Sequence, residues 1–313
     1  MITRKLALLL IVAFISCKKD EPRPVFRIDG LTTENYPKVD GSTSTQPLHY
    51  LVAAELLGGR YTWQQQLYLD GTWAILPNFD DIPREFFVER IKTSQTHNSI
   101  INLIDKEADL IFSARKMSDD EKAHAAEAGV TIIETPIALD AFIFIANPQN
   151  PISSLTTKQI QDIYMGNVTN WQEVGGENEA IIPFVRNQNS GSQELMESLV
   201  MNGLDMPKWE EEMLGSMMLV FNRVRFEPNS LCYTVYYYKE QIVRDRTLVK
   251  TLAVDGVTPT EKTISNGSYP LVAEVYACIR SDLDPNAMAH KLYKYLQTEE
   301  GKKLIALSGY IPI

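Results

Sequence analysis

Apolar residues along the chain follow two alternating periodicities from about residue 37 onward. Short apolar runs that are typical of buried strands cover residues 109–112, 131–133, 141–146 and 181–185. Between them, apolar residues three or four positions apart predict helices over 48–57, 100–106, 119–128, 157–164 and 192–201. Strands that alternate with helices indicate an α/β fold built on mostly parallel sheets.

Several helix starts carry recognisable signals. Ser118-Asp119-Asp120-Glu121 and Thr156-Thr157-Lys158-Gln159 have the spacing of capping boxes, in which a hydroxyl and an acid or amide satisfy backbone N–H groups. Pro47 falls in the first turn of its predicted helix, where a missing N–H does no harm.

Residues 58–95 are the part of the chain where this pattern is hardest to follow. Aromatic residues recur there with irregular spacing, namely Tyr61, Trp63, Tyr68, Trp73, Phe79, Phe86 and Phe87. We expect them to form a local core under a long loop rather than a ligand cage.

The first residues have the order of an export signal. Arg4 and Lys5 precede an apolar run over 6–15, which is too short for a bilayer span of roughly 20 residues, and Ser16 and Cys17 follow. The Ser16-Cys17 end of this run resembles a bacterial lipobox, which implies a signal peptide over 1–16 and lipidation at Cys17. Residues 17–36 are polar and are predicted to be a tether. The mature protein is thus expected to be exported and anchored in the cell envelope by its lipid.

The charge balance excludes one class of partner. The chain has 313 residues with 30 Lys and Arg against 40 Asp and Glu, so its formal net charge is −10 and no basic block is present. Removal of the signal peptide with Arg4 and Lys5 makes the balance more acidic still. Nucleic acid and anionic lipid, which need a positive surface, are therefore not expected as main partners.

The cysteines and histidines do not indicate a metal or a cofactor. Cys232 and Cys278 lie in apolar stretches and are expected to be buried thiols, although the sequence leaves a disulfide between them open. The four His residues, at 49, 97, 124 and 290, have no partner at metal-ligand spacing. No nucleophile elbow or phosphate-binding Gly-rich loop is present, so an enzyme is not expected.

Three helix starts share a composition suited to an anion. They are Gly41-Ser42-Thr43-Ser44-Thr45, Thr96-His97-Asn98-Ser99 and Arg186-Asn187-Gln188-Asn189-Ser190-Gly191-Ser192. Each would present hydroxyls and free backbone N–H groups at the positive end of a helix dipole. Hydroxyl residues at helix starts are more often simple caps. The third segment is more specific because Arg186 adds a guanidinium that fits a tetrahedral oxyanion.

These and further segments resemble the phosphate-binding proteins of ABC-type uptake systems, in the type II solute-binding superfamily. The segments that carry the resemblance are Asp40-Gly41-Ser42-Thr43-Ser44, Ala108 to Arg115, Ala138 to Phe142 with Asn147-Pro148, Leu155 to Gly176, Ser268 to Leu271, and Glu299 to Pro312. The stretch that ends in Asn170-Trp171-Gln172-Glu173-Val174-Gly175-Gly176 is the most specific of them.

The resemblance implies a two-lobed clamp with a strand hinge, which closes on one phosphate or similar oxyanion and delivers it to an ABC permease. Lobe 1 would comprise residues 37–138 and 274–313, and lobe 2 residues 139–273. The implied ligand contacts are Thr43, Ser44, Thr96, Arg186, Ser190, Gly191 and Ser192, with Ser113 and Arg115 as further candidates. Trp171 is expected in the core of lobe 2. An oxyanion sensor or a surface interaction lipoprotein on the same fold stays open as an alternative.

The chain departs from the family at three places. Ala114 stands where well-studied phosphate binders carry an Asp that accepts the ligand's proton, so the identity of the anion does not transfer. His97 occupies a position where small residues are usual, and it would either donate to the anion or, as we favour, face solvent. Residues 58–95 look longer than the matching family segment and would alter the rim of the cleft or contact a partner.

Overall fold

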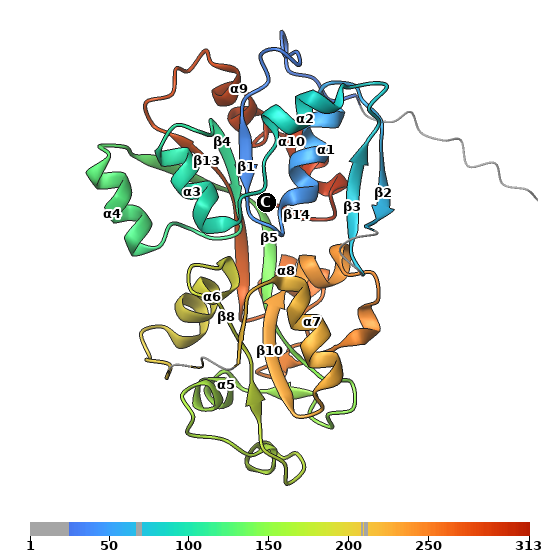
Figure 1. The fold of residues 1–313 in the computed structure, drawn as a ribbon, viewed down its shortest axis with the longest axis vertical. Helices are drawn as coiled ribbons and strands as arrows, with labels where there is room; N and C mark the ends of the chain where they lie inside the picture. Colours follow the sequence, from blue (N-terminus) through green and yellow to red (C-terminus); the bar gives the residue numbers. More distant parts are fainter. Residues whose placement is uncertain (1–24, 67–70, 208, 210–211) are drawn as a thin grey trace, which may run out of the picture.

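Two lobes, stacked along the long axis of the molecule, make up the part of the chain that the computed structural model describes (Figure 1). It describes residues 25–66, 71–207, 209 and 212–313. The predicted signal peptide over 1–16 and the predicted lipidation site Cys17 lie outside these residues.

Lobe 1 contains both ends of the described chain. Its elements are β1 (Val39–Gly41), α1 (Gln46–Leu56), β2 (Tyr61–Gln65), β3 (Trp73–Pro77), α2 (Arg84–Arg90), α3 (Thr96–Ile104), β4 (Leu110–Ser113), α4 (Asp119–Glu127), α9 (Met288–Tyr295), α10 (Glu299–Leu307) and β14 (Ile311–Pro312). The capping box predicted at Ser118 is present at the start of α4.

Lobe 2 is formed by the middle of the chain. Its strands are β6 (Ser154–Leu155), β7 (Ile182–Pro183), β8 (Val185–Arg186), β9 (Met213–Leu214), β10 (Ser230–Val235), β11 (Lys250–Thr251) and β12 (Ala253–Val254). Its helices are α5 (Thr157–Tyr164), η1 (Trp171–Val174), α6 (Gly191–Leu195), η2 (Met196–Met201), α7 (Met217–Phe226), η3 (Tyr238–Ile242), η4 (Arg246–Leu248) and α8 (Glu261–Ser265). The second predicted capping box, at Thr156, opens α5, and Trp171 is buried as expected.

Two long strands, β5 (Ile132–Ala146) and β13 (Val272–Arg280), run between the lobes (Figure 1). The main sheet has the order β1-β4-β13-β5-β10-β7, with β11 and β14 also paired to β5. Parallel pairs occur in each lobe, β1 with β4 and β10 with β7, whereas the pairs made by β5 and β13 are antiparallel. The sheet is therefore mixed rather than mostly parallel, and the long strands account for the difference.

The prediction of two strands at 131–133 and 141–146 was wrong, because β5 is continuous. Pro136 and its polar neighbours interrupt the apolar pattern in the sequence. In the structure a shift of register between Val275 and Tyr276 lies opposite Pro136, and such bulges are among the few places where a strand accommodates proline. The predicted strand at 181–185 is likewise divided, into β7 and β8.

Asp140 lies where β5 passes from one lobe to the other. Its neighbours Ala138 and Leu139 pair with β14 of lobe 1, and pairing with β10 of lobe 2 begins at Phe142. The Asp140 carboxylate is buried and accepts hydrogen bonds from the backbone N–H groups of Ala141 and Tyr237, at 2.7 and 2.9 Å. Burial raises the pKa of Asp140 to about 7. The predicted lobe boundaries, 138/139 and 273/274, fall within β5 and β13.

The described part of the predicted tether belongs to the body of lobe 1. Phe26 and Tyr36 are buried, and the Tyr36 ring packs against Phe86 at 5.3 Å between centroids. Because residues 17–36 are mostly polar, the sequence pattern did not indicate that Phe26 and Tyr36 would be buried. The prediction of a tether over this range was therefore wrong for residues 26–36.

Residues 58–95 form a hairpin, β2 and β3, followed by α2, instead of a long loop. Phe86 and Phe87 are buried, so the expected local core is present. The hairpin also reaches lobe 2: the Arg244 N–H donates to the Gly71 carbonyl at 2.8 Å, and Thr72 forms an antiparallel bridge with Val243. This segment thus provides a contact between the lobes that is separate from β5 and β13.

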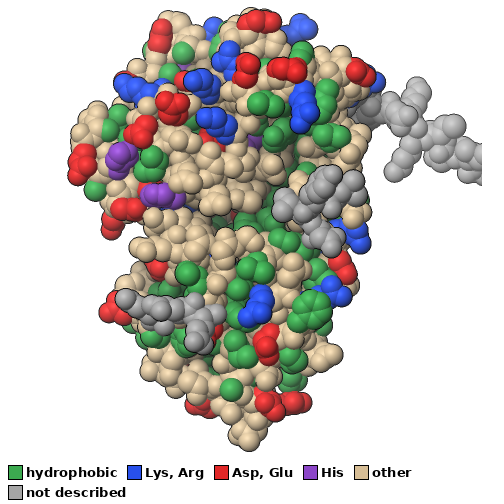
Figure 2. Space-filling model, viewed as in Figure 1, with side chains coloured by type: hydrophobic (Ala, Val, Ile, Leu, Met, Phe, Trp, Pro, Cys, Tyr) green, Lys and Arg blue, Asp and Glu red, His purple; other side chains and the backbone are tan. Residues whose placement is uncertain are grey.

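Cys232 and Cys278 are both buried and unbonded to each other, as the first of the two sequence interpretations held. No helix among the described residues is long and apolar enough to cross a bilayer. Charged side chains of both signs are spread over the two lobes on the face shown in Figure 2, while the waist between the lobes is mostly uncharged on that face.

We predict that Asp140→Asn raises stability at high pH. A raised folded-state pKa means that the contribution of Asp140 to stability is complete below about pH 4 and is lost as the pH rises through about 7. The variant keeps an acceptor for the two N–H groups but has no charge to bury. Urea unfolding at pH 8 should therefore show the variant more stable, by on the order of 1.4 kcal/mol for each pH unit that separates the folded-state pKa from that of the unfolded chain. Equal stabilities at pH 8, or a difference that persists at pH 4, would contradict this assignment.

Candidate functional site

A small pocket lies between the lobes and is lined by residues of both. The pocket has a volume of about 120 Å³. Its lining residues are Ser42, Thr43, Ser44, Gln95, Thr96, Ala114, Arg186, Ser190, Gly191, Ser192, Leu195, Gly215, Ser216, Met217 and Val235. All seven principal residues predicted from the sequence are among them. Typical sites for drug-sized ligands occupy about 300–1,000 Å³, so this pocket suits a small ion.

The lobe 1 wall of the pocket is held by hydroxyl groups. Ser42 is buried, and its Oγ lies 2.9 Å from Thr96 Oγ1 and accepts the Ala114 N–H at 2.9 Å. Thr45 donates from Oγ1 to the Phe112 carbonyl at 3.0 Å. These bonds join the β1–α1 loop to the start of α3 and the end of β4. The sequence pattern named Thr43 and Ser44 but missed the structural role of Ser42.

His49 lies beneath this loop and is not a cation of the site. Its Nε2 is 2.8 Å from Thr45 Oγ1, and its ring stacks on Phe112. Burial lowers the pKa of His49 to about 4. The ring is therefore neutral at pH 7 and serves to fix Thr45.

Arg186 provides the positive charge of the lobe 2 wall. It ends β8, is only 6% exposed, and donates from Nε to the Leu214 carbonyl at 2.9 Å. Its backbone N–H is held by Tyr233 and Gln193. Among the described residues, no carboxylate pairs with it and no protein acceptor bonds its terminal nitrogens. Burial lowers the pKa of Arg186, as expected for a cation without a counter-charge.

Four helices begin at the pocket. The starts of α1, α3 and α6 were predicted to lie there, and α7 is a fourth, with Gly215, Ser216 and Met217 on the pocket wall. Ser190 and Ser216 cap α6 and α7 by accepting backbone N–H groups at 3.1 and 3.2 Å. The α7 start was missed, although a serine before the apolar run from Met217 is a helix-start signal. The helix α3 also begins at Thr96, four residues before the predicted position.

The two lobes touch at Gly191 and Thr96. A Cβ built on Gly191 would lie 2.5 Å from Thr96 Oγ1, which is closer than real Cβ contacts. Only a glycine therefore allows α6 of lobe 2 to approach α3 of lobe 1 this closely. The structure describes the closed arrangement of the pocket.

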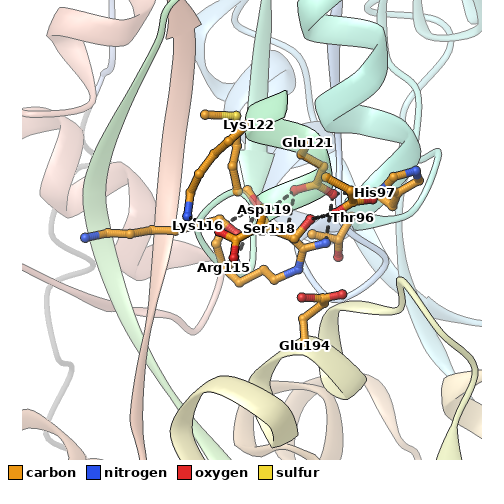
Figure 3. A network of polar contacts seen from close by, with 12 residues as sticks. Thr96, His97, Arg115, Lys116, Ser118, Asp119, Glu121, Lys122 and Glu194 are labelled. Atoms are coloured by element: carbon orange, nitrogen blue, oxygen red, sulfur yellow. Dashed lines mark hydrogen bonds and ion pairs between the residues drawn. The ribbon is translucent and has the colours of Figure 1, made fainter. Parts of the chain in front are cut away.

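Ser113 and Arg115, the two further candidates, do not line the pocket. The Ser113 hydroxyl donates to the Arg115 carbonyl, and the Arg115 guanidinium forms a two-bond ion pair with Glu121 at 2.7 and 2.9 Å. His97 does not line the pocket either. Its side chain is 25% exposed, and its Nδ1 lies 2.9 Å from Glu121 Oε1 (Figure 3). The buried Glu121 therefore joins α3, α4 and the end of β4 behind the pocket.

The described residues that line the pocket offer hydroxyls, backbone N–H groups and one guanidinium, and none of them carries a carboxylate. Ala114 presents a methyl group and donates its N–H to Ser42. Such a lining favours an oxygen-rich anion that accepts many hydrogen bonds. No cluster of His, Cys, Asp or Glu that could hold a metal is found within the described part of the chain.

A pocket of donors between two lobes that share crossing strands defines a clamp-type binding fold. The domain described as the PBP superfamily domain matches residues 62–300, and the chain therefore belongs to that superfamily. This agrees with the two-lobed clamp fold that the sequence resemblance implied.

Two of the proteins that are similar in sequence are both named phosphate-binding protein PstS. The chain is 23% identical over 204 residues to PstS of Bacillus subtilis. This match covers 65% of this chain and 62% of that protein. It is 22% identical over 258 residues to PstS of Borreliella burgdorferi. This second match covers 78% of this chain and 89% of that protein. The match to the first of these relatives thus leaves more than a third of its length uncovered.

Solved structures share the fold. A putative phosphate ABC transporter substrate-binding protein with bound phosphate from Clostridium perfringens superposes with a TM-score of 0.63 at 21% identity, over 88% of this chain and 98% of that one. An ABC-type phosphate transport receptor from Vibrio cholerae gives a TM-score of 0.62 at 21% identity, over 87% and 98%.

We predict that Glu121→Gln destabilises the protein by about 3–5 kcal/mol near neutral pH, because it leaves the buried Arg115 charge without its partner. Burial alone would raise the pKa of Glu121, but the hydrogen bonds and the charge of Arg115 lower it. This stability is therefore present above about pH 4.5 and is lost as the pH falls further. Urea unfolding at pH 7 and pH 4 measures both effects. Asp119→Asn is the matched control on the same helix, since its side chain is 99% exposed; a loss as large in the control would contradict the role of burial.

Proposed function

We propose that this chain captures phosphate, or a similar tetrahedral oxyanion, in the pocket between its lobes. Arg186 carries the proposal, because a buried guanidinium without a carboxylate partner among the described residues is satisfied best by an anion from outside. The proposed ligand contacts are Thr43, Ser44, Thr96, Arg186, Ser190, Gly191 and Ser192.

Each wall of the pocket would contribute a different kind of contact. From lobe 2, the two terminal nitrogens of Arg186 would bind two oxygens of the anion, and the start of α6 would add N–H and hydroxyl donors. Thr43, Ser44 and Thr96 of lobe 1 would bind the remaining oxygens. An anion held from both sides stabilises the closed lobes, because neither lobe alone provides all the donors.

The proposed biological role is delivery of the anion to an ABC permease. The names of the relatives, which include a phosphate ABC transporter substrate-binding protein and a phosphate transport receptor, support this role. The chain would be exported and held in the cell envelope through a lipid on Cys17.

The direct test measures binding of phosphate, arsenate, sulfate and molybdate to the purified mature protein by calorimetry and by the shift in melting temperature. We expect phosphate or a related tetrahedral oxyanion to bind and to raise the melting temperature. No binding of any of the four would overturn the proposal.

In the same assay, Arg186→Ala should weaken anion binding by at least about 100-fold. Two charge-assisted hydrogen bonds at about 1.5–3 kcal/mol each would be lost. The ligand-free variant should be at least as stable as the wild type, because a buried charge without a counter-charge is removed.

Arg225→Ala is the control for this variant, since Arg225 is an exposed cation of the same lobe that stacks on Phe226. It should leave the affinity within about twofold of the wild type, because an exposed charge is screened by solvent. Wild-type affinity in Arg186→Ala would show that the site is wrong even if an anion binds.

Lipidation is tested separately. The native protein should partition with the membrane fraction and incorporate a fatty-acid label, and Cys17→Ser should abolish both, because a thiol is the attachment point. Unchanged labelling of the Cys17→Ser protein would exclude this anchor while leaving the anion proposal intact.

A further inference from the structure

The turn before α1, which lines the anion pocket, contains one backbone carbonyl that the turn itself does not satisfy. In residues 42–45, three of the four carbonyls accept the backbone N–H group three positions along the chain. The Ser44 carbonyl has no such partner, because the residue three positions on is Pro47, which lacks an N–H group. The following N–H group, that of Leu48, donates to the Thr45 carbonyl instead. A buried carbonyl requires a donor, and the local sequence provides none for Ser44.

Tyr310, close to the other end of the chain, supplies this donor. Its hydroxyl donates to the Ser44 carbonyl at 3.1 Å, and both residues are only 3% exposed. No second hydrogen bond to this carbonyl occurs among the described residues. Tyr310 follows Gly309, whose φ of +93° turns the chain from α10 into β14, and β14 pairs with β5 beside the lobe crossing. The C-terminal segment thus holds the pocket turn from the direction of the crossing.

Tyr237 of lobe 2 holds the Tyr310 ring in turn. The two rings stack with 3.6 Å between their centroids and 5° between their planes. The Tyr237 hydroxyl donates to the Ser308 carbonyl of lobe 1 at 2.7 Å, and its backbone N–H donates to Asp140 at the crossing at 2.9 Å. Burial raises the pKa of both tyrosines, so both hydroxyls keep the proton that they donate.

We propose that Tyr310 is a positioning residue of the anion site, and that Tyr237 acts through it from lobe 2. This inference rests on the function proposed above and adds to the same clamp two residues that do not line the pocket. The Ser44 carbonyl belongs to one planar peptide with the Thr45 N–H group, so a bond to Tyr310 fixes the orientation of that plane. Thr43 and Ser44 are thereby held where they face the anion.

Loss of the Tyr310 hydroxyl releases this turn. The Ser44 carbonyl would then turn toward another donor, and the turn would leave its binding arrangement for part of the time. An anion that binds only the correct arrangement has its affinity reduced by the fraction of molecules that adopt it. If about a tenth of the molecules adopt it, the apparent affinity falls about tenfold.

The first test is Tyr310→Phe, which removes the hydroxyl and keeps the ring on Tyr237. We expect phosphate to bind about tenfold more weakly than to the wild type in calorimetry. In the anion-free protein, the amides of residues 45 and 46 should exchange with solvent at least about tenfold faster, as measured by NMR. A phosphate affinity within about twofold of the wild type would overturn the role of Tyr310.

Tyr269→Phe is the matched control. Tyr269 is also buried, its hydroxyl also donates to a backbone carbonyl, that of Phe142 at 2.9 Å, and it does not line the pocket. The control makes the same chemical change and should lower the stability against urea to a similar extent. Its phosphate affinity should stay within about twofold of the wild type, because the pocket turn keeps its donor. An equal loss of affinity in the control would show a general loosening of the protein and overturn the positioning role.

The role of Tyr237 is tested by Tyr237→Leu in two backgrounds. The substitution should weaken phosphate binding in the wild type but cause little further loss in a protein that already carries Tyr310→Phe, because Tyr237 acts on the anion only through Tyr310. The same fold loss in both backgrounds would overturn this part of the inference.

The amide exchange separates this inference from the proposed function. A wild type that binds none of the four oxyanions named above would overturn the proposed function. Faster exchange at residues 45 and 46 in Tyr310→Phe, but not in Tyr269→Phe, would still support the hold of Tyr310 on the turn. Equal exchange in the wild type and Tyr310→Phe would overturn it.

Discussion

Two arginines are buried near the cleft, and only one of them has an acidic partner within the protein. The organisation of the cleft depends on this difference. Arg115 is 5% exposed and has its counter-charge in Glu121, whereas Arg186 is 6% exposed and has none among the described residues. Removal of a charge from water is costly unless a partner compensates. The protein thus keeps the positive charge of Arg186 buried where four helices begin. A counter-charge for it has to come from a bound anion.

The overall charge of the chain makes this local arrangement necessary. At a formal net charge of −10, the field of the whole molecule does not attract an anion. Attraction has to come from groups that are close and desolvated, namely the guanidinium and the backbone N–H groups at the starts of α1, α3, α6 and α7. The site is therefore insulated from the surface charge, and the acidic exterior can serve solubility without affecting the pocket.

Short-range signals in the sequence predicted much of this structure. The capping boxes at Ser118 and Thr156 marked α4 and α5 because their chemistry lies within four residues. The seven principal site residues were implied by the family resemblance, which rests on short segments of the chain: three helix starts and Arg186 at the end of β8. Features that depend on residues far apart in the sequence were missed.

The missed features share this physical cause. The bulge that lets β5 continue through Pro136 depends on β13, more than 130 residues later. The pairing of His97 with Glu121 needs α3 and α4 to pack side by side, and the contact of the hairpin with Val243 needs both lobes in place. The start of α7 was missed for a different reason. Its cap, Ser216, is a short-range signal, but the segment is not among those that resemble the family.

The contact between the β2–β3 hairpin and lobe 2 has a mechanical consequence. The lobes are joined at the β5 and β13 crossing and again where Gly71 bonds to Arg244. This second attachment lies outside the crossing strands and consists of hydrogen bonds alone, so it can be broken and remade without any change in the crossing. Wider opening of the lobes therefore requires the hydrogen bond between Arg244 and Gly71 to break.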